Sequence, residues 1–280
     1  MFRRLVVVTV VLLGFAAFGL LITLLQTYRL NAHLKQSQFN LAQLSFFAAH
    51  HARPDPGQAA RLLPHEVPAG TVPLPGVVPE NRLSWAVAVL PWLADRKFTT
   101  EELVRTVRPD RPWNDEANQQ VARAALAIFL CPENPPPLEA DTPAPTCYVG
   151  VAGLGNDAAS LVLREGVPTP PRAGPFRYEG PTPFERITDG LSQTLLIGET
   201  ADAPGPWLRG GPSTVRGVDD AAGARPLIGS GGQFGGFFPM GANFSLCDGS
   251  VRLFTPQTTP GVFYRLATIA GATAEAGPAD

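Results

Sequence analysis

Four residues near the C-terminal end could supply oxygen ligands from a single predicted hairpin: Asn243, Asp248, Gly249 and Ser250. Oxygen is the ligand that a hard cation such as Ca²⁺ prefers, but this ion takes about six to eight of them. Asn243 and Asp248 are therefore only weak metal candidates. A role as a turn is enough to explain the motif Asp248-Gly249-Ser250, because Asp-Gly is the most typical two-residue turn of a β-hairpin.

No other pattern is typical of catalysis. Asp189 precedes a glycine and is first of all a turn residue, so Asp189 and Glu199 are speculative ligands. The chain has no His-Glu-x-x-His, Cys-x-x-Cys or Gly-x-Ser-x-Gly sequence, which are signatures of zinc and hydrolase sites. We expect no catalytic residue, no cofactor and no enzymatic activity.

The three cysteines allow several arrangements. In an oxidising compartment an odd number leaves one thiol over. Cys131 with Cys147 closes the shortest loop, and this disulfide would add about 3 kcal/mol in the chain-entropy model. The alternative is that Cys131, Cys147 and Cys247 are all buried and unpaired.

The elements that must position these residues begin with the hairpin itself, over residues 243–254. A two-residue loop places Leu246 opposite Val251 on the core face and Ser245 opposite Arg252 on the water face. After it, Thr259-Pro260 is typical of a helix start. Further upstream, the sequence predicts a helix over residues 115–129 and short strands over residues 147–150 and 194–198.

The N-terminal end contains an uninterrupted apolar run, residues 5–25, directly after Arg3 and Arg4. At ~1.5 Å per residue this helix would span about 32 Å, which matches the ~30 Å hydrocarbon core of a bilayer. The two arginines favour a cytoplasmic N-terminus. A cleaved signal peptide is the alternative, but its apolar core is usually ~7–15 residues long and ends in a small-residue cleavage site. We expect a single-pass anchor in the inner membrane with the rest of the chain outside.

The helix is predicted to continue over residues 26–50 as an amphipathic rod. Leu30, Leu34, Leu41 and Leu44 recur at helical spacing and form one apolar stripe. This stripe is the candidate interface with another chain. The alternative is that it covers the core of its own head.

The amino-acid composition indicates the fold class of the chain outside the N-terminal helix. Thirty prolines and 28 glycines indicate long irregular connections, and the formal charge of −2 argues against a nucleic-acid surface. We expect an α+β fold: a rod helix over residues 1–52, a head with a small antiparallel sheet over residues 53–271, and a flexible tail over residues 272–280.

Several segments together resemble a known family. In order along the chain these are RLNAHLKQSQFNLAQLSFFAAH, SWAVAVLPWL, PWNDEAN, FLCP, YVGVAG, ITDGLSQTLLIGE and GANFSLCDGSVRLF. Together they resemble a large bacterial family of pilin-like proteins of unknown function that carries a C-terminal His-x9-Asp-Gly motif. The resemblance implies a prepilin-type N-terminal helix, a pilin-like fold and an extracytoplasmic head, with possible links to type II secretion-like machinery.

The chain departs from this family at two places. The N-terminus lacks the Gly and Glu of a prepilin cleavage site, which puts processing and filament assembly in doubt. Phe238 stands where the motif has histidine, while Asp248 and Gly249 remain.

The sequence therefore predicts a membrane-anchored pilin-like structural or interaction protein. Its expected partners are membrane lipid and other pilin-like or secretion-system proteins, and not nucleic acid. The alternative is a membrane-tethered module that binds a solute or glycan in a pocket lined by several of its four tryptophans.

Overall fold

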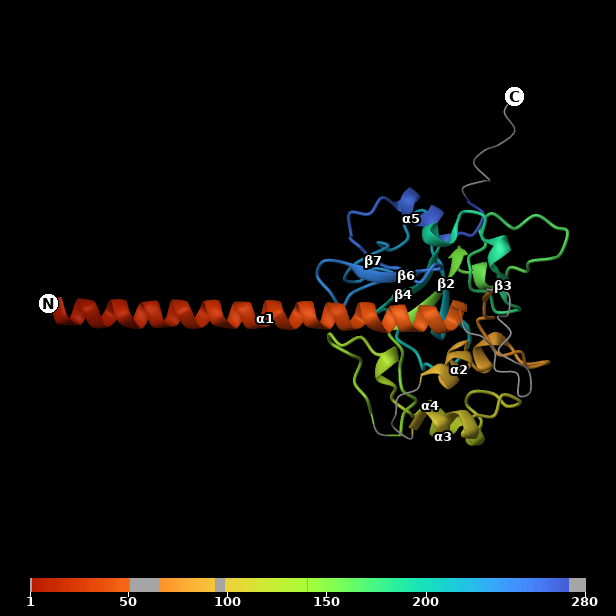
Figure 1. The fold of residues 1–280 in the computed structure, drawn as a ribbon, viewed down its shortest axis with the longest axis horizontal. Coiled ribbons are helices and arrows are strands. Elements are labelled where there is room, and N and C mark those ends of the chain that lie inside the picture. The colour runs from red at the N-terminus through yellow and green to blue at the C-terminus, as the bar shows by residue number, and fades with distance from the viewer. Residues whose placement is uncertain (1, 51–65, 94–98, 140, 272–280) are drawn as a thin grey trace, which may run out of the picture.

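A computed structural model describes residues 2–50, 66–93, 99–139 and 141–271. It has the α+β architecture that the sequence predicts: one long N-terminal helix and a head with a small, mostly antiparallel sheet (Figure 1). The start of the predicted head, residues 53–65, and the predicted tail, residues 272–280, lie outside the described residues.

Helix α1 runs without interruption from Phe2 to His50 (Figure 1). Residues 12–29 are exposed and project beyond the head, whereas Ser37, Leu41, Leu44 and Ala48 are fully buried within it. The same helix is therefore a projecting rod in one half and part of the hydrophobic core in the other.

Five strands form the main sheet in the order β5-β2-β4-β6-β7. Their bounds are β2 Tyr148–Leu154, β4 Leu195–Glu199, β5 Val215–Val218, β6 Ala242–Leu246 and β7 Val251–Phe254. All neighbouring pairs are antiparallel except β2 and β5, which are parallel. A two-stranded sheet pairs β1 (Glu66–Val67) with β3 (Thr182–Pro183). Both short strands predicted from the sequence are present: β2 begins one residue after the predicted start and runs on to Leu154, and β4 is displaced by one residue toward the C-terminus.

The main sheet is covered on both faces. Helix α5, Pro260–Ala267, packs on one face, where Phe263 contacts Phe234, Phe244 and Phe254. Helix α1 crosses the other face and contacts β4, β6 and β7. Alternation of side chains along each strand explains how β6 can be buried on both sides.

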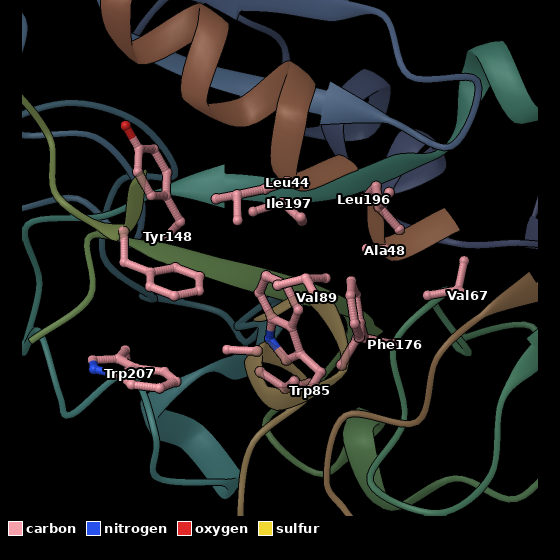
Figure 2. Packing of buried hydrophobic residues seen from close by; sticks show 14 of the residues in the cluster. Leu44, Ala48, Val67, Trp85, Val89, Tyr148, Phe176, Leu196, Ile197 and Trp207 are labelled. Carbon is pink, nitrogen blue, oxygen red and sulfur yellow. The ribbon is translucent and has the colours of Figure 1, made fainter. Parts of the chain in front are cut away.

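Short helices enclose the other side of α1 (Figure 1). They are α2 Ala86–Val89, α3 Thr99–Thr106 and α4 Gln119–Ala122. The 3₁₀ turns of the described chain are Pro79–Asn81, Leu90–Trp92, Glu116–Asn118, Ala127–Phe129, Ala158–Ser160, Phe184–Arg186, Leu191–Gln193 and Gly211–Ser213. Of these, Ala158–Ser160, Leu191–Gln193 and Gly211–Ser213 contact strands of the main sheet. Figure 2 shows the resulting core, in which Leu44 and Ala48 of α1 lie with Leu196 and Ile197 of β4 near Trp85. The C-terminal half of α1 is thus packed between the sheet and these short helices, with part of its surface, including Phe39 and Phe46, left exposed.

The prediction of one continuous helix over residues 115–129 is wrong. Asp115 caps a 3₁₀ turn, α4 ends at Ala122, and a second 3₁₀ turn follows at Ala127–Phe129. The carbonyl of Ala122 accepts from the N–H of Ala144 (2.8 Å), and that of Ala124 accepts from Trp207 Nε1 (2.9 Å). These tertiary hydrogen bonds replace the bonds that would have continued the helix.

The hairpin exists, but its predicted register is off by one residue. Ser245 lies opposite Val251 and Phe244 opposite Arg252, so Leu246 does not face Val251. The N–H of Leu246 donates to the carbonyl of Ser250 (2.8 Å), which closes a three-residue loop. Gly249 has φ +84°, as expected for the glycine that ends such a loop with a bulge.

Candidate functional site

A buried polar cluster joins α1 to the sheet. Its members are Ser37 from α1, Tyr148 from β2, Glu199 from the end of β4 and Asn243 from β6, and each is 0% exposed. Because these strands are neighbours and α1 crosses them, four side chains far apart in the sequence meet at one point.

Asn243 holds the Glu199 carboxyl from the sheet side. Its backbone N–H donates to Oε2 (2.6 Å) and its side-chain Nδ2 donates to Oε1 (3.0 Å). Gln38 of α1 donates in turn from Nε2 to Asn243 Oδ1 (3.1 Å), which fixes the orientation of the amide. Both carboxyl oxygens of Glu199 are therefore occupied.

Ser37 holds the same carboxyl from the helix side. Its hydroxyl donates to Glu199 Oε1 and is also hydrogen-bonded to the Tyr148 hydroxyl (2.8 Å). The three groups thus form a chain from β2 through α1 to β4. Hydroxyl groups rotate to suit their partners, so this chain can serve either a neutral or an ionised carboxyl.

Burial raises the pKa of Glu199, although the hydrogen bonds from Ser37 and Asn243 act in the opposite direction. Burial likewise raises the pKa of Tyr148, and the negative charge of Glu199 adds to this effect. All four side chains are closed off from solvent. The cluster is suited to fastening α1 to the sheet.

The predicted metal candidates do not meet. Asn243 is buried against Glu199, whereas Asp248 is exposed at the hairpin tip. Asp248 Oδ1 accepts from the backbone N–H (2.9 Å) and hydroxyl (2.7 Å) of Ser250, and Gly249 completes the turn. Within the described residues no group of three or more His, Cys, Asp or Glu side chains could hold a metal ion. The motif Asp248-Gly249-Ser250 is a structural turn.

The four stripe leucines have two different environments. Leu41 and Leu44 are 0% exposed and belong to the main core, so their surfaces are not available to another chain. Leu30 and Leu34 are partly buried against a cluster that contains Cys131, Cys147 and Phe238. At Leu41 and Leu44, therefore, the apolar stripe covers the core of its own head and is not an interface with another chain.

The cysteines are three free, buried thiols in the structure. Cys131 and Cys147 share the cluster beneath Leu30 and Leu34, and Cys247 lies in the main core. Burial raises the pKa of Cys147 to about 12 and raises that of Cys247 further. Phe238 is also buried in the Cys131 cluster. At this position the chain has an apolar packing residue.

Two shallow cavities lie on the described surface. The first, about 190 Å³, is lined by Tyr178, Asp202, Arg216, Arg225 and Gln233 among others. Asp202 pairs with both arginines of the lining: Arg225 binds both of its oxygens at 2.8 Å, and Arg216 Nη1 lies 3.6 Å from Oδ2. The second, about 320 Å³, lies beside Gln193 and α5. Neither is lined by a tryptophan, and Trp85 and Trp207 are each 1% exposed in the core.

A model of the family described as proteins of unknown function (DUF1559) matches residues 63–224, which is more than half of the chain. The chain belongs to the DUF1559 family. The match includes Glu199 and Tyr148 but ends before Asn243, and α1 precedes it. No curated protein and no solved structure matches the chain. Membership in the DUF1559 family gives no activity, so function must be argued from the geometry.

Sequence reasoning treated Glu199 only as a speculative ligand and did not find its partners. The available signal was a charged residue at the end of the apolar strand TLLIGE, whose remaining positions favour burial. Such a carboxyl needs hydrogen-bond donors. The donors Ser37 and Asn243 lie 162 and 44 residues away along the chain, and only the fold identifies them.

Proposed function

We propose that the protein is a single-pass membrane protein whose head lies outside the inner membrane and acts through protein contacts, without catalysis. The observation that carries this is the division of α1. Residues 12–29 are apolar for most of their length, exposed and clear of the head, while residues 37–48 help to form the core (Figure 1).

The exposed half of α1 is difficult to explain in water. Leu12, Leu13, Phe15, Phe18, Leu20 and Leu24 are each more than half exposed. This part of α1 belongs to the one described helix that is long and apolar enough to cross a membrane, and no described residue covers it. Lipid is the solvent that makes such a surface favourable. Arg3 and Arg4 before the run favour a cytoplasmic N-terminus.

Membrane fractionation of the full chain tests the anchor. Wild-type protein is expected in the membrane fraction and to resist alkaline extraction. The double variant Leu20→Arg/Leu21→Arg is expected to lose insertion, because each charge near the helix centre costs about 2.5–3.5 kcal/mol. Val162→Arg, a substitution at an exposed position of the head, is the matched control. Wild-type protein dissolved in detergent-free buffer would overturn the proposal.

The orientation of the protein in the membrane is tested separately. Alkaline phosphatase fused after residue 271 is expected to be active, because the enzyme folds only outside the cytoplasm. Arg3→Glu/Arg4→Glu is expected to reduce this activity, since it removes the positive charges that retain the N-terminus. An inactive fusion with the wild-type sequence would place the head inside the cell.

We further propose that the protein assembles with a second membrane-anchored pilin-like or secretion-system chain through an exposed face of α1. Tyr28 is 76% and Phe39 56% exposed, and about three helical turns separate them, so both lie on one face. This face continues directly from the membrane segment. A partner helix that lies in the same bilayer could therefore follow it on to the head.

Cross-linking in membranes tests this face. The native cysteines are buried, so a thiol at Phe39→Cys can be addressed selectively. A thiol cross-linker is expected to join Phe39→Cys to a neighbouring chain more efficiently than Val162→Cys, its exposed control on the head. Equal yields from the two variants would remove the assembly proposal and leave the anchor proposal intact.

A further inference from the structure

The position of α1 on the head is set by both apolar and polar contacts. If α1 were displaced by three residues, so that Leu41 occupied the place of Leu44, Gln38 would enter the fully buried place of Leu41. The same shift would put Leu34 in the place of Ser37. Glu199 would then face a side chain that cannot donate a hydrogen bond. The polar contact at Glu199 therefore adds to the leucine stripe in distinguishing the two positions.

Other polar contacts between α1 and the head are more exposed or longer. His33 Nδ1 lies 2.6 Å from Glu133 Oε2, with side chains 27% and 15% exposed. Asn40 Nδ2 donates to the carbonyl of Leu130 at 3.3 Å, and Ser45 Oγ to that of Leu246 at 3.4 Å. Glu199 is the buried carboxyl in this set, and the loss of a donor is most costly for a buried ionisable group.

We propose that Glu199 is a latch whose carboxyl fixes α1 at one position on the sheet, and that ionisation of this carboxyl weakens the hold. The inference concerns contacts inside one chain, so it does not depend on the proposed membrane anchoring or assembly. Buried polar groups that specify the register of packed helices are the general precedent for such a role.

The surroundings of Glu199 explain why ionisation weakens the latch. From α1 it faces Ser37, and from β6 it faces Asn243, neither of which is ionisable. From β2 it faces Tyr148, and Cys147 and Cys131 lie within its electrostatic reach. These three groups become negative when they ionise, and no cation among the described residues acts on Glu199. Within this part of the chain, a charged Glu199 is thus buried without a counter-ion.

The neutral carboxyl fits the same partners. Its O–H can donate to Ser37 Oγ, and the Ser37 hydroxyl can turn toward Tyr148, while Asn243 still donates to the carboxyl from the sheet side. Burial raises the pKa of Glu199, so the neutral form persists to higher pH than in an exposed carboxyl. The latch is therefore tightest in acid and loosens as the pH rises through this raised pKa.

Hydrogen exchange on the full chain in detergent tests the latch. The readout is the protection of α1 amides over residues 37–48, corrected for the intrinsic pH dependence of exchange, with β2 and β4 as internal references. In wild-type protein α1 protection is expected to fall as the pH rises above the ordinary carboxyl range and through the raised pKa of Glu199, and strand protection to change less. Glu199→Gln cannot ionise and is expected to abolish this dependence.

Two further variants keep the test decisive. Ser37→Ala removes only the helix side of the contact and is expected to lower α1 protection by about tenfold. Glu133→Gln removes a carboxyl that also binds α1 and is the matched control, with the wild-type pH profile retained over residues 37–48.

The proposal is overturned if Ser37→Ala leaves α1 protection unchanged. It is also overturned if Ser37→Ala lowers protection equally in α1 and the strands, because Glu199 would then only support global stability. A pH dependence that persists in Glu199→Gln would overturn the role of ionisation. Should Glu199→Gln fail to fold, the Ser37→Ala result still decides whether the latch exists.

Discussion

Asn243 donates two hydrogen bonds to Glu199 across neighbouring strands, from its backbone N–H at 2.6 Å and its side-chain amide at 3.0 Å. The two residues belong to the segments ITDGLSQTLLIGE and GANFSLCDGSVRLF, which the sequence sets far apart. Their contact, closed from above by Ser37 of α1, joins the rod to the centre of the sheet.

Substitution of Asn243 should therefore be costly. Asn243→Ala removes a donor from a buried carboxyl and is expected to lower the free energy of unfolding by about 1–3 kcal/mol. Urea unfolding followed by circular dichroism measures this. Ser250→Ala at the exposed hairpin tip is the control and should change stability by less than about 0.5 kcal/mol. Equal effects from the two variants would contradict the role given to Asn243.

Global stability should carry a pH signature of Glu199. Its pKa is raised in the folded state, so its contribution is fully present below the ordinary carboxyl pKa and is lost as the pH rises through the raised value. The free energy of unfolding of wild-type protein, minus that of Glu199→Gln, is therefore expected to decrease with rising pH above the ordinary carboxyl range. Urea titrations at several pH values measure this difference; a difference that grows with pH would have the wrong sign.

Gly198 should not tolerate a side chain. A Cβ there would lie 2.3 Å from Cε1 of Phe244, in the fully buried strand before Glu199. Gly198→Ala is expected to destabilise the head by about 1–3 kcal/mol through overpacking. Gly261→Ala is the matched control, because α5 leaves open space at that position. It is expected to stabilise the protein by roughly 0.5–1 kcal/mol, so thermal unfolding should shift in opposite directions for the two variants.

The cysteines should be unreactive in the folded protein. All three are buried, and burial raises the pKa of Cys147 to about 12, so little nucleophilic thiolate exists near neutral pH. Iodoacetamide followed by intact mass is expected to show no modification before denaturation. After denaturation without reductant, three modified thiols agree with the free cysteines of the structure. A single modified thiol at Cys247 would instead establish the Cys131–Cys147 disulfide.

The sequence predicted the elements whose signal is local. Helix α1 was evident from its apolar run and leucine spacing, and α5 from Thr259-Pro260 and the apolar residues that follow. Of the apolar residues that follow this helix start, Phe263, Leu266, Ile269 and Ala270 are buried, whereas Val262 is 42% exposed. The spacing of apolar residues predicts which face of a helix is buried. This prediction uses neighbouring residues only, so it needed no knowledge of the remainder of the fold.

Features that depend on competing hydrogen bonds were not predictable in the same way. The Asp248-Gly249 pair fits either a two-residue turn or the end of a three-residue loop, because both need a glycine with positive φ. The carbonyls of Ala122 and Ala124 end the predicted helix only because Ala144 and Trp207 reach them. The cluster around Glu199 required α1, β2, β4 and β6 to be placed together first.

Because α1 is continuous from the projecting segment to Ala48 inside the core, no hinge separates the two parts within the described helix. A truncated form that begins after α1 would lack Leu41 and Leu44 and would expose the core residues that they cover. A water-soluble version must therefore retain the helix from about Tyr28 onward. A force applied to the N-terminal end would likewise be transmitted along the continuous helix. It would reach β4 directly through the hydrogen bond from Ser37 to Glu199.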